Sequence, residues 1–203
     1  KLGFGKFNVY HAKALSQDVE FALKVFPKNW VSTKTYLREK LIRSLLHHEN
    51  ILYEYAVADH SLDCNVLLSE YAPFGNFYDL ITKVPVMNDK IIRSYFHQLV
   101  DAIDYLHSKD VAHLDLKLEN LLLGKNFRLK VSDFDQSQLA SEKEQIFGGT
   151  LNYRAPEIRK GACKDFFAAD VYSMGIILYA MKTREFPLAE LSKCQSETIN
   201  DEN

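Results

Sequence analysis

The chain has 203 residues, of which 47% are hydrophobic and 26% are charged, a composition typical of a folded domain with ample material for an apolar core. Its formal net charge at pH 7 is −2, which gives no general attraction to nucleic acid or to anionic membranes. We therefore expect neither nucleic acid nor a membrane as a partner.

The spacing of the cysteines and the length of the apolar runs indicate the cellular compartment of the protein. The three cysteines, Cys64, Cys163 and Cys194, are odd in number and too far apart for a metal-binding pair, which is typical of reduced thiols. The most apolar run, residues 171–181, is too short to cross a bilayer. We expect a cytoplasmic protein, with a nuclear location as the alternative.

Residues 2–10 combine glycines with strand-forming residues, and this pattern predicts a strand, a tight turn and a second strand. Gly3 and Gly5 allow backbone N–H groups to approach a phosphate closely. Two glycines alone, however, are more typical of an ordinary hairpin. Because the first residue is Lys1 rather than Met and the glycines follow at once, we expect a piece of a longer chain with further domains.

Residues 21–26 alternate between the two faces of a predicted strand and are rich in strand formers. This alternation places Lys24 on the face opposite Leu23 and Val25. A single lysine in a strand is usually a solvated charge at the edge of a sheet. The strand alone therefore gives Lys24 no function.

Residues 33–48 have the spacing of a helix, with Leu37, Leu41 and Leu45 on one stripe. Glu39 lies in the middle of this helix. A carboxylate in such a place can be one charge on a solvated face, or it can have a partner elsewhere in the fold. The helix alone leaves both interpretations open.

A buried strand is predicted at residues 66–72, and the turn at 73–75 follows it. After the turn, Asn88 or Asp89 can cap a long amphipathic helix. The apolar residues of this helix recur at i, i+3, i+4 and i+7, and they are Ile91, Ile92, Tyr95, Phe96, Leu99, Val100, Ile103 and Leu106. This spacing predicts a helix that packs on the core.

The segment 113–120 sets four polar residues, His113, Asp115, Lys117 and Asn120, among leucines. The leucines anchor the segment in a core, while the polar groups can converge on something outside it. A proton acceptor, a cation and an amide that can bind a hard metal ion suit phosphate chemistry, in which charge placement does most of the work. The alternative is an ordinary strand–loop–strand with buried leucines.

A short strand at residues 129–132 leads into Asp133, which lies 18 residues after Asp115. Asn120 and Asp133 offer hard oxygen ligands of the kind that Mg²⁺ prefers. Farther along, residues 170–179 are apolar on nearly all sides, which predicts a buried helix. The sequence therefore predicts a magnesium site next to the segment with the four polar residues.

In this order the segments resemble the motifs of eukaryotic protein kinases. Residues 2–10 resemble the loop Gly-x-Gly-x-x-Gly-x-Val, 113–120 the catalytic loop His-Arg-Asp-Leu-Lys-x-x-Asn, and 133–135 the motif Asp-Phe-Gly. Residues 148–157 resemble Gly-Thr-x-x-Tyr-x-Ala-Pro-Glu. The resemblance extends from residue 2 to about residue 188, and it looks most like calcium/calmodulin-dependent or AMP-activated kinases.

The resemblance implies an α+β, bilobal, kinase-like fold. It places a small β-rich N-lobe with one regulatory helix at residues 1–69, incomplete at its start, and a hinge at 70–75. It places a mainly helical C-lobe, which lacks its last helices, at residues 76–203. The expected function is an ATP-dependent protein serine/threonine kinase that transfers the γ-phosphoryl group of Mg-ATP to a Ser or Thr hydroxyl of a protein substrate.

The resemblance also assigns roles to single residues. Asp115 would accept or orient the proton of the substrate hydroxyl, and Lys117 would neutralise charge on the transferred group. Lys24, fixed by Glu39, would position the phosphates. The other implied roles are ligation of Mg²⁺ by Asn120 and Asp133, support of the catalytic-loop backbone by Asp170, and nucleotide binding by Gly3, Gly5, Val9, Ala22, Lys24, Glu70, Ala72 and Leu122. Lys117 together with Thr150 is typical of serine/threonine specificity.

Four positions depart from the kinase pattern. They are Asn8 in place of the third glycine, Arg43 in place of an apolar residue, Leu114 in place of arginine and Asp135 in place of glycine. These departures support an alternative function, a catalytically weak kinase-like module that binds nucleotide or partners. The arginine replaced by Leu114 normally binds a phosphorylated activation loop. We therefore expect activity without phosphorylation of Ser137, Ser141 or Thr150.

Overall fold

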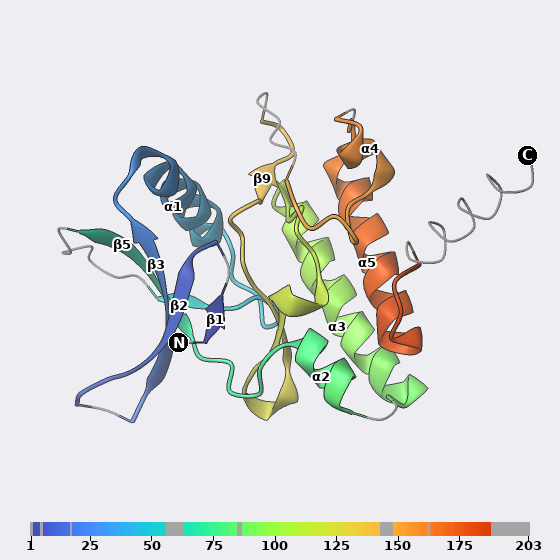
Figure 1. The fold of residues 1–203 in the computed structure, drawn as a ribbon, viewed down its shortest axis with the longest axis horizontal. Helices are drawn as coiled ribbons and strands as arrows, with labels where there is room; N and C mark the ends of the chain where they lie inside the picture. Colours follow the sequence, from blue (N-terminus) through green and yellow to red (C-terminus); the bar gives the residue numbers. More distant parts are fainter. Residues whose placement is uncertain are drawn as a thin grey trace, which may run out of the picture.

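The computed structural model describes residues 2–4, 6–16, 18–55, 63–84, 87–142, 148–161 and 163–187. The N-terminal residues form a sheet with one helix beside it, and the later residues form a mainly helical part (Figure 1). This arrangement confirms the α+β fold class. The residue boundaries expected for the two lobes and the hinge stay predictions.

The N-terminal strands form one antiparallel sheet with the order β1-β2-β3-β5-β4. Its strands are β1 (Gly3–Phe4), β2 (Asn8–Lys13), β3 (Glu20–Pro27), β4 (Glu54–Tyr55) and β5 (Cys64–Glu70). Lys24 lies on the central strand, where it pairs with Val9 on one side and Leu67 on the other. The interpretation of Lys24 as an edge charge is therefore wrong. Asn8 is the first residue of β2, so its backbone is extended and needs no left-handed turn.

Helix α1 (Trp30–Ser44) begins three residues earlier than the predicted range and ends before its predicted end at residue 48. The early start follows from Asn29, whose side chain accepts a hydrogen bond from the Ser32 backbone N–H at 2.9 Å. The helix packs on the sheet through Tyr36, whose ring centroid lies 5.6 Å from that of Phe26. The prediction of a helix in this region is confirmed, but the helix begins and ends earlier than predicted.

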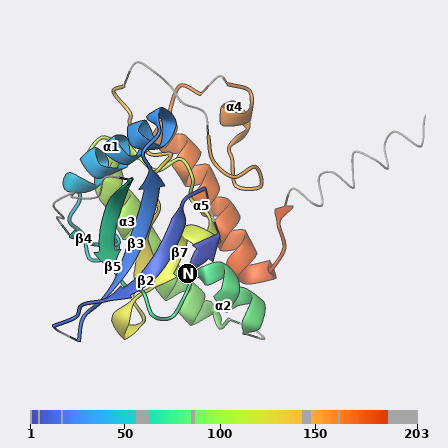
Figure 2. The ribbon, with the colours of Figure 1, turned by 60° about the vertical axis from the view of Figure 1, so that its left-hand side comes forward.

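The helical part is built around two long helices that lie side by side, α3 and α5 (Figures 1 and 2). Its helices are α2 (Phe77–Lys83), α3 (Asp89–Ser108), α4 (Pro156–Arg159) and α5 (Phe166–Thr183). The side chain of Asn88 accepts a hydrogen bond from the Lys90 backbone N–H at 2.8 Å, which confirms one of the two predicted caps. Within the described ranges, no helix has both the length and the apolar character needed to cross a membrane.

Several short strands and 3-10 helices lie between α3 and α5 in the chain. They are β6 (Val111–Ala112), η1 (Leu118–Asn120), β7 (Leu121–Leu123), η2 (Lys125–Phe127), β8 (Leu129–Val131) and β9 (Gln138–Leu139). The leucines around the predicted polar segment, Leu116, Leu118 and Leu121, are fully buried in the main core. Burial of these side chains fixes the backbone from which the polar groups project.

Candidate active site

A cavity of about 590 Å³ is lined by residues of the sheet and of the helical part. Six of the predicted nucleotide-binding residues line it, namely Val9, Ala22, Lys24, Glu70, Ala72 and Leu122. Gly3 lies in β1, and Gly5 lies outside the described residues. The fold therefore brings together side chains from β2, β3, β5 and β7 that are far apart in the sequence.

Lys24 lines this cavity and lies between two carboxylates. Its Nζ is 2.7 Å from Oε2 of Glu39 and 2.6 Å from Oδ1 of Asp133. Burial alone would lower the pKa of Lys24, but the charges of Glu39 and Asp133 outweigh it and raise the pKa above its ordinary value. Glu39 is 0% exposed, so the interpretation of Glu39 as a charge on a solvated face is wrong. The expected ion pair between Lys24 and Glu39 is present.

Arg43 extends this ion-pair network behind the cavity. Its Nη1 is 3.8 Å from Oε1 of Glu39 and its Nε is 2.5 Å from Oε2 of Glu54. Its Nη2 donates a hydrogen bond of 2.9 Å to the carbonyl of Leu52, and its guanidinium lies 5.6 Å from the ring centre of Phe134. Arg43 thus connects α1, the sheet and the residue after Asp133, a role that sequence reasoning missed. Its position four residues after Glu39 was the available signal.

Asp115 is the centre of a hydrogen-bonded group in the predicted catalytic loop. Nζ of Lys117 lies 2.6 Å from Oδ2 of Asp115 and 2.9 Å from Oγ1 of Thr150. The N–H and the hydroxyl of Thr150 both donate to Oδ1 of Asp115, each at 2.8 Å. The side-chain amide of Asn120 donates to the backbone carbonyl of Asp115 at 2.9 Å. The polar residues of this loop therefore meet at one point, which the alternative of a plain strand–loop–strand does not require.

Asp170 of α5 holds the backbone of the same loop. Its carboxylate accepts hydrogen bonds of 2.8 Å from the N–H groups of both His113 and Leu114. The ring of His107 lies 3.0 Å from the same carboxylate. These bonds support Leu114 in a left-handed backbone conformation, with φ of 62°, which is unusual for a leucine. The predicted contact between Asp170 and the loop backbone is confirmed.

Gly149 allows Thr150 to approach Asp115. Its φ is +90°, and a Cβ added there would lie 2.4 Å from the carbonyl oxygen of Leu114. A side chain would thus push the segment away from the loop that contains Asp115. Steric hindrance by the Leu114 carbonyl therefore explains why a glycine suits this position of the 148–157 motif.

Asn120 and Asp133 are held next to each other through Ser132. The backbone N–H and the hydroxyl of Ser132 both donate to the backbone carbonyl of Asn120, each at 2.9 Å. Burial acts to raise the pKa of Asp133, but the charge of Lys24 and its hydrogen bond lower it below the usual value, so the carboxylate is ionised. An ionised carboxylate and a neighbouring side-chain amide form a donor set of hard oxygens.

This donor set fits Mg²⁺ better than a metal held by protein alone. Among the residues that the structure describes, no group of three or more His, Cys, Asp or Glu side chains could form a metal cage. Mg²⁺ usually takes one or two carboxylates together with substrate phosphates and water. Asn120 and Asp133 therefore fit a magnesium ion that enters with a phosphate ligand.

Asp135 is the departure from pattern that lies nearest to this site. Its backbone is not in the left-handed region, so the missing glycine causes no strain in this conformation. Its Oδ2 lies 3.9 Å from Nζ of Lys6, in the segment after the first strand. Burial, and then the charge of Asp133, raise the pKa of Asp135 to about 6.

Comparison with known proteins agrees with this geometry. Residues 1–203 match the family model described as the protein kinase domain. The chain is 38% identical over 197 residues to the CBL-interacting protein kinase 11 of Oryza sativa subsp. japonica, with 92% of this chain and 39% of that protein covered. It is 36% identical over 199 residues to the CBL-interacting serine/threonine-protein kinase 20 of Arabidopsis thaliana, with 93% and 45% covered.

Both relatives are longer than this chain. The chain spans 39% to 45% of the length of the two relatives named above. Protein kinases generally use ATP and Mg²⁺, and the cavity, Lys24 and the Asn120–Asp133 pair agree with that use. The family match covers the whole chain and includes every motif singled out in the sequence, so this chain belongs to the protein kinase domain family.

Proposed function

We propose that this chain is the catalytic domain of a serine/threonine kinase that transfers the γ-phosphoryl group of Mg-ATP to a Ser or Thr hydroxyl of a protein. The observation that carries the proposal is the group around Asp115, in which Lys117 and Thr150 contact the same carboxylate. A carboxylate with a lysine beside it suits a hydroxyl acceptor and a charged phosphoryl group. The names of the relatives, which are serine/threonine kinases, support this specificity.

The walls of the cavity suit a nucleotide. Val9, Ala22 and Leu122 offer apolar surface for a flat base. Glu70 and Ala72 line the cavity in and just after β5, where backbone groups can bind the edge of the base. Lys24 also lines the cavity and offers a positive charge for the phosphates. Ala22 and Lys24 are two residues apart on β3 and therefore share one face of the strand, so apolar surface for a base lies next to a cation for phosphates.

Each of the site residues then has its own role in the phosphoryl transfer. Asp115 accepts or orients the proton of the substrate hydroxyl, while Lys117 neutralises charge on the transferred group. Lys24 positions the α- and β-phosphates, and Glu39 fixes Lys24. Asn120 and Asp133 would hold Mg²⁺, which neutralises phosphate charge when it is bound.

Setting and partners follow as further proposals. The substrate is a protein, and the relatives are named for interaction with CBL, which supports a protein partner besides the substrate. The net charge of −2 supports neither nucleic acid nor an anionic membrane as a partner. We place the protein in the cytoplasm, with the nucleus as the alternative, and microscopy of a fluorescent fusion would distinguish the two.

A thermal-shift titration tests the nucleotide site. For wild type, ATP with Mg²⁺ at 100 times its Kd should stabilise the chain by about 2.7 kcal/mol, or about 5–10 °C in Tm. Asp133→Asn should lose most of this shift, because the amide removes the negative charge that a magnesium ion needs. ATP with EDTA should shift neither protein.

The matched control for this titration is Asp104→Asn, which changes an exposed carboxylate on α3 outside the cavity. It should keep the full shift with Mg-ATP. An unchanged shift in Asp133→Asn would show that this carboxylate does not hold the metal. No shift in folded wild type would favour a module that binds partners rather than nucleotide.

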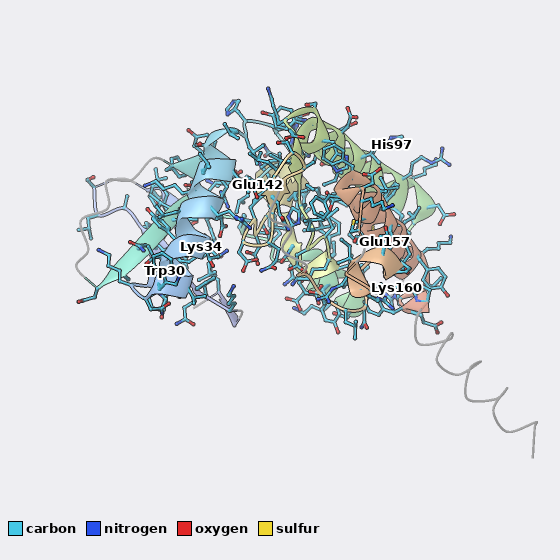
Figure 3. The ribbon with its side chains drawn as sticks, turned by 90° about the horizontal axis from the view of Figure 1, so that it is seen from above. Trp30, Lys34, His97, Glu142, Glu157 and Lys160 are labelled. Atoms are coloured by element: carbon cyan, nitrogen blue, oxygen red, sulfur yellow. The ribbon has the colours of Figure 1, made fainter. Side chains whose placement is uncertain are left out.

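The residues on both sides of β9 (Gln138–Leu139) are held by hydrogen bonds and an ion pair of the unphosphorylated chain. Glu142 lies beside α1 (Figure 3), and its Oε2 is 3.3 Å from Nη2 of Arg38. One residue earlier, the hydroxyl of Ser141 donates to Oδ2 of Asp110 at 2.5 Å. The hydroxyl of Ser137 is buried and donates to the carbonyl of His113 at 3.1 Å. These bonds use charges and dipoles that the unmodified chain already has.

We therefore expect full activity after phosphatase treatment. A phosphate on Ser137 would require a buried dianion, and one on Ser141 would face the carboxylate of Asp110, so neither is favoured. Mass spectrometry before and after treatment should accompany the assay of phosphate transfer. A loss of more than about tenfold on complete dephosphorylation would show that a phosphate group is needed.

A further inference from the structure

Lys6 and Asp135 form an ion pair between the sheet and the helical part of the chain. Lys6 follows β1, whereas Asp135 follows Asp133 in the later part. Both residues line the cavity. Nζ of Lys6 lies 3.9 Å from Oδ2 of Asp135, whose side chain is only 8% exposed. The pair therefore connects the two parts of the chain at the cavity rather than on the outer surface.

The position of Lys6 is set by its neighbour Phe7. Phe7 is buried and packs on Phe26, with ring centroids 4.3 Å apart. Nζ of Lys6 lies 5.2 Å from the centroid of the Phe7 ring, and Nζ of Lys24 lies 5.7 Å from the same centroid. Burial of Phe7 anchors the segment that carries Lys6. Both ammonium groups thus lie beside one ring, where a single chain of phosphates can meet them.

Among the residues that the structure describes, three lysines line the cavity, and Lys6 has the longest contact to a carboxylate. Lys24 has carboxylate oxygens at 2.7 and 2.6 Å, and Lys117 has one at 2.6 Å. The contact of Lys6 is 3.9 Å long, and its side chain is 52% exposed. An exposed ion pair of this length is weak, so the ammonium group of Lys6 can turn to a more highly charged ligand at little cost.

Asp135 gives the Lys6 side chain a resting place at the cavity. Its Oδ1 accepts a hydrogen bond of 3.3 Å from the side-chain amide of Gln136, and its Oδ2 faces Lys6. The kinase pattern has glycine at this position, which offers no side chain to a lysine. The carboxylate follows closely after Asp133, the proposed magnesium ligand. It therefore holds Lys6 next to the place where the phosphates would bind.

We propose that Lys6 is a further phosphate-binding residue of this site, whose ammonium group contacts the outer phosphates of the nucleotide, and that Asp135 is the positioning residue that holds Lys6 for this contact. Lys6 then adds a second cation, from the segment after β1, to the one that Lys24 supplies. Charge-assisted contacts to phosphate are short and strong, so bound nucleotide draws the ammonium group away from Asp135. This inference rests on the proposed binding of Mg-ATP.

Isothermal titration calorimetry of the full chain with Mg-ATP and with AMP tests the role of Lys6. Lys6→Met should weaken Mg-ATP binding by about tenfold, the loss of one charge-assisted contact, and AMP binding by less than about twofold. Lys6→Arg should keep the Mg-ATP affinity within about threefold of wild type, because it keeps the positive charge. The matched control is Lys13→Met on β2, which changes an exposed lysine that pairs with Asp18 outside the cavity and should leave both affinities unchanged.

A double-mutant cycle tests the role of Asp135. Asp135→Asn removes a negative charge near the phosphates, which favours binding, but it also releases Lys6, which disfavours binding. In the Lys6→Met background only the first effect remains, so Asp135→Asn should raise the Mg-ATP affinity by about threefold more there than in wild type. Equal effects in the two backgrounds would show that Asp135 does not position Lys6.

Different results would overturn the role of Lys6 and the proposed function. Equal Mg-ATP binding by Lys6→Met and wild type would overturn the role of Lys6 and leave the nucleotide site in place. Equal losses of Mg-ATP and AMP affinity in Lys6→Met would mean that the lysine only supports the fold of its segment, which overturns the role as well. A folded wild type that binds neither nucleotide would overturn both proposals. Loss of Mg-ATP affinity in Lys6→Met, in a chain that transfers no phosphate, would uphold Lys6 and reject the kinase activity alone.

Discussion

Asp115→Asn should lower kcat for phosphate transfer by about 10²–10⁴-fold, the share that a positioned general base usually supplies. The carboxylate accepts hydrogen bonds from Lys117 and from both donors of Thr150. An amide cannot take up a proton, and its NH₂ group would face one of these donors. Steady-state transfer from Mg-ATP to a serine-containing protein measures the effect. The thermal shift with Mg-ATP should stay close to that of wild type.

The control for Asp115→Asn is Asp101→Asn, an exposed carboxylate on α3 that should leave kcat unchanged. A melting curve checks the fold, because Asp115 is only 7% exposed. Retention of wild-type kcat in Asp115→Asn would remove Asp115 from the chemistry. Wild type that binds Mg-ATP without transferring phosphate would favour the catalytically weak, kinase-like module.

Contacts between residues of recognisable motifs could be predicted from sequence. The Lys24–Glu39 pair and the bonds from Asp170 to the loop backbone are present as expected. Each joins segments whose order and spacing match a known arrangement, so the resemblance carried long-range information that local patterns lack. Local rules were enough for the cap at Asn88, because a cap depends on neighbouring residues alone.

The orientation of α1 could not be predicted in the same way. The leucine stripe has a helical period, but period alone does not determine which face meets the core. Leu37 and Leu41 face solvent because the buried face of the helix holds other side chains, among them Glu39 and Arg43, whose partners come from distant strands. The buried residues of the helix are Ser32, Tyr36, Glu39, Ile42 and Arg43. Glu54, the carboxylate closest to Arg43, lies in a two-residue strand that no pattern in the sequence indicated.

The network around Arg43 leads to the second large effect, which concerns stability. Arg43→Leu should lower the free energy of unfolding by about 3–5 kcal/mol, the usual cost of removing one partner of a buried ion pair. Leucine suits a position where the kinase pattern has an apolar residue, but Glu54 would stay behind with its side chain only 15% exposed. Urea unfolding followed by circular dichroism measures the loss.

A double variant and a pH series distinguish whether Arg43 contributes to stability through its charge or through its packing. Arg43→Leu/Glu54→Leu should recover most of the stability, because it replaces the buried pair with apolar side chains. Burial already raises the pKa of Glu54 despite the charge of Arg43, and without Arg43 the pKa should rise further. A carboxyl group with a raised pKa stabilises the fold at low pH, and this stability is lost as pH rises through the folded-state pKa. The difference in free energy of unfolding between wild type and Arg43→Leu should therefore be smaller at pH 5 than at pH 8. If that difference does not depend on pH, and the double variant does not recover the stability, Arg43 acts through its packing.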